Sequence, residues 1–384
     1  MLIVRKIRNK LHNLYWKLRC MLQQKGKLKN ILVFESTPDL SDNTKAVFDE
    51  MLRRGLNKHY KLVWLLFASD VSKASNIPNV YYLPHWDWQA RYYSKAAKAK
   101  IFCNRILEKE HDDQLSIYLS HGTGLKVTRD QYKLPHWVDY CIAASPHLEE
   151  SHAYDLDYVH AKTVGLGFPR NDVFACASTP ISHTFDVAFS KIIIWYPTFR
   201  QHNSVTYTNI QNPIPLLHNM ECAKQLNDIA VECDTLIVIK PHFAQNVQYV
   251  QKMNLSNIRF IDDCFFAKHG ISSYEFVGSS DAMVTDYSSI YYDYTLCDKP
   301  IALIWEDIEE FTNKHPLVNN YEYLTKGAEK VYSLEEFGAF IRRVSRGEDM
   351  LQNERREIRD YTNISTDGKN SQRVVDFIIE KAVL

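Results

Sequence analysis

The sequence lacks the signatures of several common protein classes. Its 384 residues contain no run of about 18 apolar residues, which excludes a predicted transmembrane helix, and no apolar core of a secretory signal. Lys and Arg number 46, as do Asp and Glu, so no net basic charge favours a nucleic-acid partner. No P-loop motif and no GxGxxG motif with an acidic partner is present, so ATP and NAD are not favoured.

Metal-binding patterns are also missing. The eight cysteines include no CxxC pair and none at zinc spacing to a histidine pair, and the chain has no HExxH motif. Scattered cysteines are typical of reduced thiols in a cytosolic protein. We therefore predict a cytoplasmic protein without a metal site of its own, and the sequence leaves a requirement for a divalent metal open.

Charge is nevertheless unevenly distributed along the chain. The first 29 residues hold nine Lys or Arg and no Asp or Glu. Leu11, Leu14, Leu18 and Leu22 recur at helical spacing, which predicts an amphipathic helix over residues 2–24. A basic amphipathic helix can lie on an anionic membrane surface, which predicts peripheral binding at the inner face of the membrane through residues 1–24. The alternative is a terminal helix docked on its own domain with a solvated basic face.

Beyond this helix, short apolar strands alternate with helical segments. Strands are predicted at residues 31–36, 101–103, 116–120 and 282–285, and residues 92–100 are predicted to be helical. Alternation of this kind predicts an α/β fold with parallel sheets buried on both faces. A polar segment near Pro180 divides the chain, so we predict residues 1–29 as the basic helix and two Rossmann-like domains, 30–178 and 187–384, facing a central cleft.

Polar clusters follow five of the predicted strands. Ligands of such sheets bind at the carboxyl ends of the strands, and clusters of His, Arg, Lys, Ser and Thr there favour an anionic ligand. The clusters are residues 120–123, 165–172, 197–200, 240–242 and 286–289.

Asp286-Tyr287-Ser288-Ser289 stands where a predicted strand ends and a helix begins. Free backbone N–H groups, a helix dipole and two hydroxyls at such a junction favour a phosphate or diphosphate. Asp-x-Ser-Ser before a helix is also an ordinary N-cap. Position among the other strand-end clusters, rather than the local motif, favours the phosphate site.

Two histidines and two arginines are the strongest candidates for chemistry. His121 lies between a strand end and a glycine-flanked turn, where an imidazole can serve as a general base, although a structural turn histidine fits the same pattern. His242 follows Lys240, and such a pair can neutralise a transferring phosphoryl group, although a surface lysine with a structural histidine fits the same pattern. Arg170 and Arg200 are candidate bidentate phosphate ligands.

The ordered set of motifs resembles the CDP-glycerol:poly(glycerophosphate) glycerophosphotransferase family of teichoic-acid and capsule polymer transferases. Each motif alone is weak, whereas the set in family order spans residues 34 to 300. The matching segments are residues 34–36 with 42–43, 121–123 with 125–126, 167–172, 196–200, 240–242, 285–289 with 293, and 298–300.

This resemblance implies a GT-B architecture and transfer of an alditol phosphate from a CDP-activated donor, CDP-glycerol or CDP-ribitol, to a hydroxyl of a lipid-linked or polymeric glycan acceptor, with release of CMP. It implies that His121 activates the acceptor and that His242 contacts the donor diphosphate, with Asp286 orienting its loop. The other implied donor-binding residues are Arg170, Asn171, Thr198, Arg200, Lys240, Tyr287, Ser288 and Ser289. The implied acceptor-side residues are Glu35, Ser36, Gly122, Thr123 and Lys126.

The sequence also departs from the family pattern. The family usually has Trp before this His and Pro after the Thr, where this chain has Ser120 and Gly124. The alditol, the acceptor and the choice between a primase and a polymerase stay open. A nucleotide-sugar glycosyltransferase, a nucleotide-sugar epimerase and a non-catalytic scaffold of an export complex are the alternatives, and the presence of both histidines argues against the scaffold.

Overall fold

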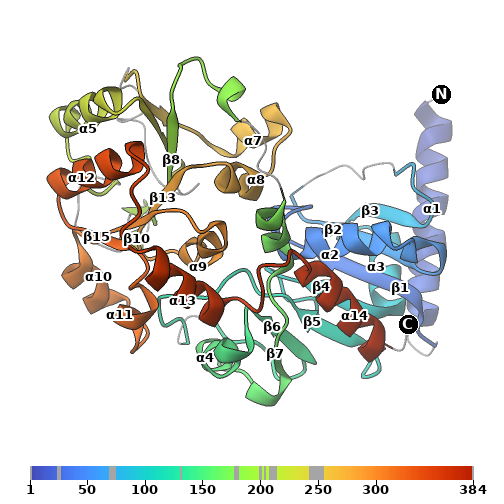
Figure 1. Ribbon diagram of the computed structural model, residues 1–384. Helices are drawn as coiled ribbons and strands as arrows, with labels where there is room; N and C mark the ends of the chain where they lie inside the picture. The colour runs from blue at the N-terminus through green and yellow to red at the C-terminus, as the bar shows by residue number, and fades with distance from the viewer. Residues whose placement is uncertain are drawn as a thin grey trace. The chain divides into compact units, whose positions relative to one another are not determined.

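The computed structural model describes residues 2–23, 27–68, 75–129, 132–176, 181–198, 201–202, 205–206, 214–241 and 255–382. It divides into two compact units (Figure 1). Unit 1 comprises Met1–Gly122, Arg129–Asp172 and Asp367–Leu384, and unit 2 comprises Thr123–Thr128 and Val173–Thr366.

Unit 1 is built on a parallel sheet of seven strands within the described residues, in the order β3-β2-β1-β4-β5-β6-β7. Its strands are β1 (Lys29–Glu35), β2 (Lys61–Leu66), β3 (Val80–Pro84), β4 (Ala97–Phe102), β5 (Leu115–Tyr118), β6 (Tyr140–Ala143) and β7 (Thr163–Gly165). Its helices are α1 (Leu2–Leu22), α2 (Asp42–Arg53), α3 (Trp88–Ala96), α4 (Glu149–Asp155) and α14 (Asn370–Ala382).

Alternation along β1 sends side chains to both faces of this sheet. Phe34 packs with Phe48 of α2 and Val374 of α14, whereas Val33 packs with Tyr93 of α3 and Cys20 of α1. All six side chains are buried, and burial of each large apolar one contributes about 1.5–3 kcal/mol. The result is a three-layer unit with helices on both faces, which is the arrangement that parallel sheets require.

The last helix completes unit 1. The Asp172 carboxylate accepts hydrogen bonds from the backbone N–H groups of Asn370 and Ser371, at 2.7 Å each, in the first turn of α14. Arg54 at the end of α2 also donates to Asp376. The sequence-based division assigned residues 187–384 to one C-terminal domain, whereas these bonds join residues 367–384 to unit 1.

Unit 2 contains a parallel sheet of six strands in the order β12-β11-β8-β13-β14-β15, and a short pair, β9 (Gln201–His202) and β10 (Val205–Thr206), among the described residues. The six strands are β8 (Lys191–Trp195), β11 (Thr235–Ile239), β12 (Ile258–Phe260), β13 (Ala282–Thr285), β14 (Ile301–Ile304) and β15 (Glu329–Val331). Its helices are α5 (Met220–Glu232), α7 (Asp263–His269), α8 (Ser273–Gly278), α9 (Ile290–Tyr294), α10 (Ile308–Lys314), α11 (Tyr321–Leu324), α12 (Leu334–Ser345) and α13 (Gln352–Thr362).

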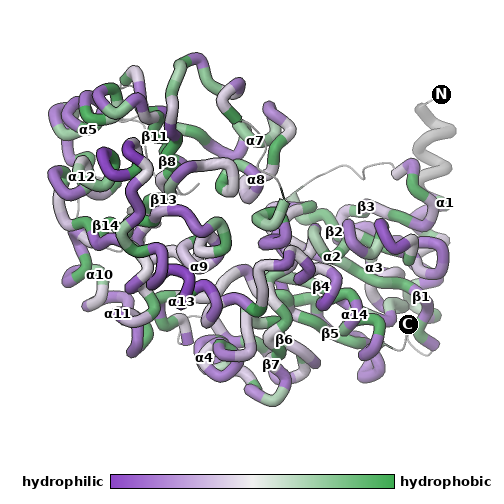
Figure 2. Tube along the Cα trace, in the orientation of Figure 1, coloured by the Kyte–Doolittle hydropathy of each residue, from purple (hydrophilic) through white to green (hydrophobic). Residues whose placement is uncertain are grey.

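Helices cover both faces of this second sheet as well. Trp195 of β8 packs with Leu226 of α5 and Phe337 of α12, whereas Ile194 packs on the other face with Phe276 of α8. Figure 2 shows α13 as mostly hydrophilic, and its buried residues are confined to one side, including Ile358. Both units are therefore Rossmann-like three-layer structures, as predicted.

One sequence-based assignment was wrong. Residues 97–100 were predicted to continue a helix, but α3 ends at Ala96 and β4 begins at Ala97. The Ala-Lys-Ala-Lys pattern has high helix propensity. In the fold, however, β4 lies between β1 and β5, and Lys100 is buried with its ammonium group donating to the Glu108 carbonyl. Tertiary burial overrides local propensity here.

Candidate active site

Two predicted site segments of unit 1, at Glu35 and at His121, lie at one edge of its sheet. The strand order reverses between β1 and β4, and such a switch point is where ligands bind in open α/β sheets. Glu35 ends β1, Asn104 follows β4 and His121 follows β5, and these strands are neighbours in the sheet. The unit therefore brings Glu35, Ser36 and Gly122 of the predicted acceptor side to the same sheet edge as the predicted base.

Glu35 is a buried carboxylate that holds this edge. Its Oε2 accepts backbone N–H groups of Asn104 at 3.3 Å and Arg105 at 2.9 Å, and its Oε1 accepts the Thr37 hydroxyl at 3.2 Å. Burial raises the pKa of the Glu35 carboxyl, while these donors oppose the rise. Ser36 is likewise buried and accepts the Ser41 N–H at 3.0 Å. Both side chains thus support the loops around them.

His121 is exposed at the end of a constrained turn. Ser120 before it has a φ of 56°, a left-handed conformation that is rare for a residue other than glycine. The Asn43 amide donates to the Ser120 carbonyl at 2.9 Å and so holds the turn. The His121 Nδ1 lies 3.4 Å from the Tyr118 hydroxyl, and burial raises the pKa of that phenol well above its ordinary value. One ring nitrogen therefore faces a neutral phenol.

Arg170 lies in unit 1 beside His121. Its Nη1 donates to Asp42 Oδ1 at 2.7 Å and to the His121 carbonyl at 2.8 Å, and its side chain is 7% exposed. Its backbone N–H donates to Asn43 Oδ1 at 3.1 Å, and the neighbouring Asn171 is buried. The guanidinium therefore connects the start of α2 with the His121 turn, and it belongs to a different unit from the predicted strand-end residues of the donor site.

His152 is a neighbour of His121 that the sequence reasoning missed. It lies on α4 and is buried, and burial lowers its pKa to about 4, with the charge of His121 as a smaller cause. Because His152 is neutral above this pKa, it places no positive charge next to His121. The pattern Glu149-Glu150-Ser151-His152 gives no sign of this role, because only the fold places α4 close to the β5 turn.

The predicted donor-binding residues of unit 2 also lie at one sheet edge. β11, β8 and β13 are neighbours, and the strand order reverses between β8 and β13. Lys240 follows β11, Thr198 follows β8 and Asp286 follows β13. The Lys240 Nζ lies 3.0 Å from Asp263 Oδ1, with its side chain 17% exposed.

Asp286 fixes the two central loops of this edge. Its buried carboxylate accepts the Thr198 N–H at 3.0 Å, the Thr198 hydroxyl, and the Tyr287 N–H at 2.6 Å. The Tyr287 ring is stacked on Phe311 at 3.7 Å, and its hydroxyl donates to Asp307 Oδ1 at 3.0 Å. The loop before α9 is thus anchored on both sides.

The two serines after Tyr287 remain at the surface of this anchored loop. Ser288 and Ser289 are partly exposed, and α9 begins at Ile290. Ser289 occupies the N-cap position, but its side chain makes no capping hydrogen bond. The ordinary N-cap role therefore does not explain the Ser289 side chain. The other capping candidate, Asp286, instead accepts hydrogen bonds from Thr198 and Tyr287.

The remaining predicted site residues are distributed as follows. Gly122 is the last residue of its unit 1 segment and has a φ of 152°, whereas Thr123 and Lys126 belong to unit 2. Lys126 pairs with Leu317 in an isolated antiparallel bridge. Arg200 and His242 lie outside the described residues, so their roles stay predictions.

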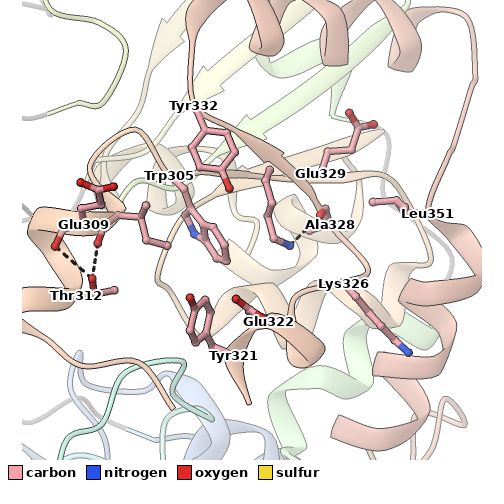
Figure 3. Close-up of a pocket in the computed structure, with 12 residues that line it drawn as sticks. Trp305, Glu309, Thr312, Tyr321, Glu322, Lys326, Ala328, Glu329, Tyr332 and Leu351 are labelled. Carbon is pink, nitrogen blue, oxygen red and sulfur yellow. Dashed lines mark hydrogen bonds between the residues drawn. The ribbon is translucent and has the colours of Figure 1, made fainter. Parts of the chain in front are cut away.

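A cavity of about 620 Å³ lies in unit 2 beside the loop after β14 (Figure 3). Trp305, Tyr321, Tyr332 and Lys330 are among its walls, and the Lys330 Nζ donates to the Ala328 carbonyl at 3.0 Å. Burial lowers the pKa of Lys330 to about 7. The loop after β14 continues to Asp307, which accepts the hydrogen bond of the Tyr287 hydroxyl. The cavity therefore adjoins the contact that holds Tyr287 in place. The sequence reasoning did not single out this cavity, although the polar residues Glu306 and Asp307 after the apolar run of β14 were a usable signal.

Two features are absent from the described residues. No group of three or more His, Cys, Asp or Glu side chains is placed to hold a metal ion there. No helix in the described ranges is both long and apolar enough to cross a membrane.

Comparison of the sequence with those of known proteins identifies similar proteins. The chain is 23% identical over 226 residues to the teichoic acid glycerol-phosphate primase of Bacillus subtilis (strain 168), covering 56% of this chain and 50% of that protein. It is 22% identical over 327 residues to the teichoic acid ribitol-phosphate polymerase TarL of Staphylococcus aureus (strain NCTC 8325 / PS 47), covering 78% and 54%. The chain thus spans about half the length of these relatives.

Solved structures share the fold. The wall teichoic acid polymerase TagF superposes with a TM-score of 0.72 at 18% identity, covering 99% of this chain and 98% of that chain. A putative UDP-N-acetylglucosamine 2-epimerase from Listeria monocytogenes superposes with a TM-score of 0.55 at 12% identity, covering 92% and 96%. The fold is therefore GT-B-like, as the resemblance implied.

A family model decides the assignment. The model described as CDP-Glycerol:Poly(glycerophosphate) glycerophosphotransferase matches residues 18–380, which is nearly the whole chain. The match runs through both sheets and through every strand-end cluster described above. The chain belongs to the CDP-glycerol:poly(glycerophosphate) glycerophosphotransferase family.

Proposed function

We propose that the protein transfers an alditol phosphate from a CDP-activated donor to an acceptor hydroxyl and releases CMP. The family match over residues 18–380 carries this proposal. The relatives are described as acting with glycerol phosphate or ribitol phosphate, and one TagF structure was obtained from a CDPG soak. CDP-glycerol is accordingly our first donor, with CDP-ribitol as the alternative, and a teichoic-acid-type glycan, lipid-linked or polymeric, is the proposed acceptor.

His121 is the proposed general base. If its Nδ1–H donates to the Tyr118 hydroxyl, Nε2 is the unprotonated nitrogen of the neutral ring and can accept the acceptor's hydroxyl proton. The acceptor oxygen then forms a bond to the donor's β-phosphorus as the bond to the bridging oxygen breaks, and CMP leaves with that oxygen. Glu35, Ser36 and Gly122 shape the surrounding loops of unit 1, and Thr123 and Lys126 continue this acceptor segment in unit 2.

Unit 2 supplies the proposed donor site. The Ser288 and Ser289 hydroxyls, with the Lys240 ammonium and Thr198, are suited to phosphate oxygens, because charge-assisted hydrogen bonds are the strong ones. Asp286 and Tyr287 hold that loop in place. Arg200 and His242 are proposed to add positive charge to the same phosphates.

Arg170 and Asn171 were predicted to bind the donor. The contacts of Arg170 with Asp42 and the His121 carbonyl support a positioning role for its guanidinium. We therefore propose that Arg170 orients the His121 turn, with Asn171 buried beside it, and the binding of a donor phosphate by Arg170 stays a prediction.

The membrane surface is the proposed location of the acceptor. Leu11, Leu14, Leu18 and Leu22 of α1 are 63%, 53%, 50% and 78% exposed. A docked amphipathic helix normally buries its apolar stripe, so these exposed leucines, which we call the leucine stripe, support peripheral binding to the inner face of the membrane. Trp16 of the same helix packs against Tyr92 and Tyr93, so α1 is also docked on its own domain, and we propose that the docked helix binds the membrane through its leucine stripe.

A donor panel tests the proposed reaction. The full chain is incubated with a membrane acceptor fraction and with CDP-glycerol, CDP-ribitol or UDP-linked sugars, and CMP and UDP are quantified. We expect CMP release from a CDP-alditol that depends on the acceptor. Release of UDP from a UDP-sugar with no CMP from either CDP-alditol would assign a glycosyltransferase, and acceptor-independent conversion of a UDP-sugar would assign an epimerase.

A further inference from the structure

Unit 1 contains a cavity of about 480 Å³ between α1 and the amino-terminal edge of its sheet. Arg19 of α1, Lys29 at the start of β1 and Lys61 at the start of β2 are among its walls. These strand starts lie at the edge of the sheet opposite Glu35 and His121, because all strands of the sheet run parallel. The cavity is therefore distinct from the strand-end site of unit 1.

The lining of this cavity is positively charged. It includes the three cations and His59 but no Asp or Glu, and its other wall residues are uncharged. Within the described part of the chain, none of the three cations is ion-paired with a carboxylate, although most arginines of the protein are. Positive charge gathered without a counter-charge favours an anionic ligand.

Tyrosines hold the cations in place. The Arg19 guanidinium donates to the Tyr15 and Tyr92 hydroxyls at 2.9 Å each. The Lys61 Nζ donates to the Tyr81 hydroxyl at 3.1 Å, and the Lys29 Nζ lies 5.5 Å from the Tyr92 ring. A phenol that accepts from a cation keeps its own O–H as a donor, so Tyr15 and Tyr92 can donate to an anion that the cations attract. Phosphate oxygens match this set of donors.

We propose that this cavity, which we call the α1 cavity, binds the phosphate of an anionic phospholipid headgroup. The choice of a lipid over a free phosphate rests on the leucine stripe. Tyr15 and Arg19 line the cavity from the same helix that exposes Leu11, Leu14 and Leu18. A headgroup in the cavity would thus lie beside side chains suited to the acyl region. The inference rests on the membrane partner proposed above and gives that partner a specific contact.

A soluble short-chain lipid tests the α1 cavity without a bilayer. Dihexanoyl phosphatidylglycerol, below its micelle concentration, is titrated into the full chain by calorimetry, with dihexanoyl phosphatidylcholine and inorganic phosphate as the other probes. We expect saturable binding of one phosphatidylglycerol, at least about tenfold weaker binding of phosphate, and none of phosphatidylcholine. Phosphate binding as tight as the lipid would overturn the lipid assignment, and no binding of either anion would overturn the site.

Two lysine variants separate a defined site from general attraction. Lys61→Met is expected to weaken phosphatidylglycerol binding at least about tenfold, whereas Lys10→Met, an exposed lysine of α1 outside the cavity wall, is expected to change it less than about twofold. Equal losses of affinity in the two variants would overturn the proposal. A diffuse electrostatic attraction would weaken lipid binding about fivefold for the loss of any basic residue near the surface, inside or outside the cavity wall. Thermal unfolding confirms that Lys61→Met is folded, and Arg19→Gln repeats the test from α1.

A leucine variant tests the contribution of the leucine stripe to lipid binding. Leu14→Ser with Leu18→Ser is expected to reduce binding to phosphatidylglycerol vesicles and to weaken monomeric phosphatidylglycerol toward the affinity of inorganic phosphate, because the acyl contact is lost, whereas phosphate binding in the α1 cavity should not change. Unchanged binding of vesicles and of monomeric lipid would reject the leucine stripe as the membrane contact and, with it, the lipid assignment of the cavity. Loss of monomer binding in Lys61→Met with CMP release unchanged would show that the cavity and the transfer chemistry are independent.

Discussion

The two units fix their strand-end loops with the same device, a buried carboxylate at the switch point of the sheet, but in different surroundings. Glu35 of unit 1 accepts hydrogen bonds from the loop after β4, and Asp286 of unit 2 accepts them from the loop after β8. Unit 1 adds an ion pair, Arg170 with Asp42, beneath the exposed His121. Unit 2 leaves two serine hydroxyls and Lys240 at its edge. The difference supports the proposal of a general base on one unit and of anion ligands on the other.

Removing the ion pair should have the largest effect on stability. Arg170→Met leaves Asp42 without its partner, and because the Arg170 side chain is 7% exposed we expect a loss of about 3 kcal/mol in the free energy of unfolding. Transfer should also fall, because the His121 carbonyl loses its donor. The matched control is Lys45→Met, which breaks an exposed i,i+4 pair with Asp49 and should cost less than about 0.5 kcal/mol. Equal costs for the two variants would contradict a buried, structural Arg170.

The buried His152 of unit 1 predicts that the free energy of unfolding depends on pH. Its folded pKa of about 4 lies below the ordinary 6.5, so protonation favours the unfolded chain. Its contribution is complete above pH 6.5 and is lost as the pH falls toward 4, by about 3 kcal/mol. Chemical unfolding at pH 7 and pH 4 measures it: His152→Gln should lose less stability between these values than the native protein. The same loss in both proteins would show that His152 is not buried in its neutral form.

Isosteric amides compare the two carboxylates directly. The folded pKa of Glu35 is raised above 4.5, so its ionisation favours unfolding, and the stability present below pH 4.5 is lost as the pH rises through the folded pKa. Glu35→Gln removes that loss, and at pH 7 it should be as stable as the native protein or more so. Asp286→Asn turns an amide N–H toward the Thr198 N–H and should cost about 2 kcal/mol. Denaturant unfolding at pH 7 measures both variants. A larger loss of stability in Glu35→Gln than in Asp286→Asn would contradict this account of the two carboxylates.

Ser289 should show the smallest effect on stability. Because its side chain makes no capping bond, Ser289→Ala should change the free energy of unfolding by less than about 0.5 kcal/mol. Donor KM should rise by about tenfold if the hydroxyl binds a phosphate oxygen. Asn219→Ala, at the N-cap of α5, is the control, because its side chain accepts the Cys222 N–H at 2.9 Å and its loss should cost about 1 kcal/mol. A cost at Ser289 equal to that at Asn219 would restore the capping role.

The sequence predicted the features that depend on local pattern. The strand at 282–285 and the strand-end position of His121 follow from short apolar runs bounded by polar residues. It failed where distant segments decide the structure. Residues 97–100 became a strand through burial between β1 and β5, and Asp172 ties α14 to unit 1 across a long sequence separation.

Side-chain partners were harder to predict than positions. Arg170 was predicted from its residue type as a phosphate ligand, but a pattern cannot show that Asp42 lies 2.7 Å from its guanidinium. The same limit hid His152 and the α1 cavity, since each depends on elements brought together from separate parts of the chain. Charge balance gave a partial signal: the excess of Lys and Arg in the first 29 residues pointed to an anionic partner but not to a cavity.

Separate measurements of donor binding and transfer test the central comparison most directly. CDP-glycerol binding is measured by calorimetry, and CMP release with acceptor is measured in parallel, for His121→Ala and for the double variant Ser288→Ala with Ser289→Ala. We predict that His121→Ala keeps donor affinity within about threefold but loses at least about 100-fold in transfer, and that the serine variant loses donor affinity. Donor affinity lost in His121→Ala and retained in the serine variant would contradict the assignment of the base to unit 1 and of the donor phosphates to unit 2.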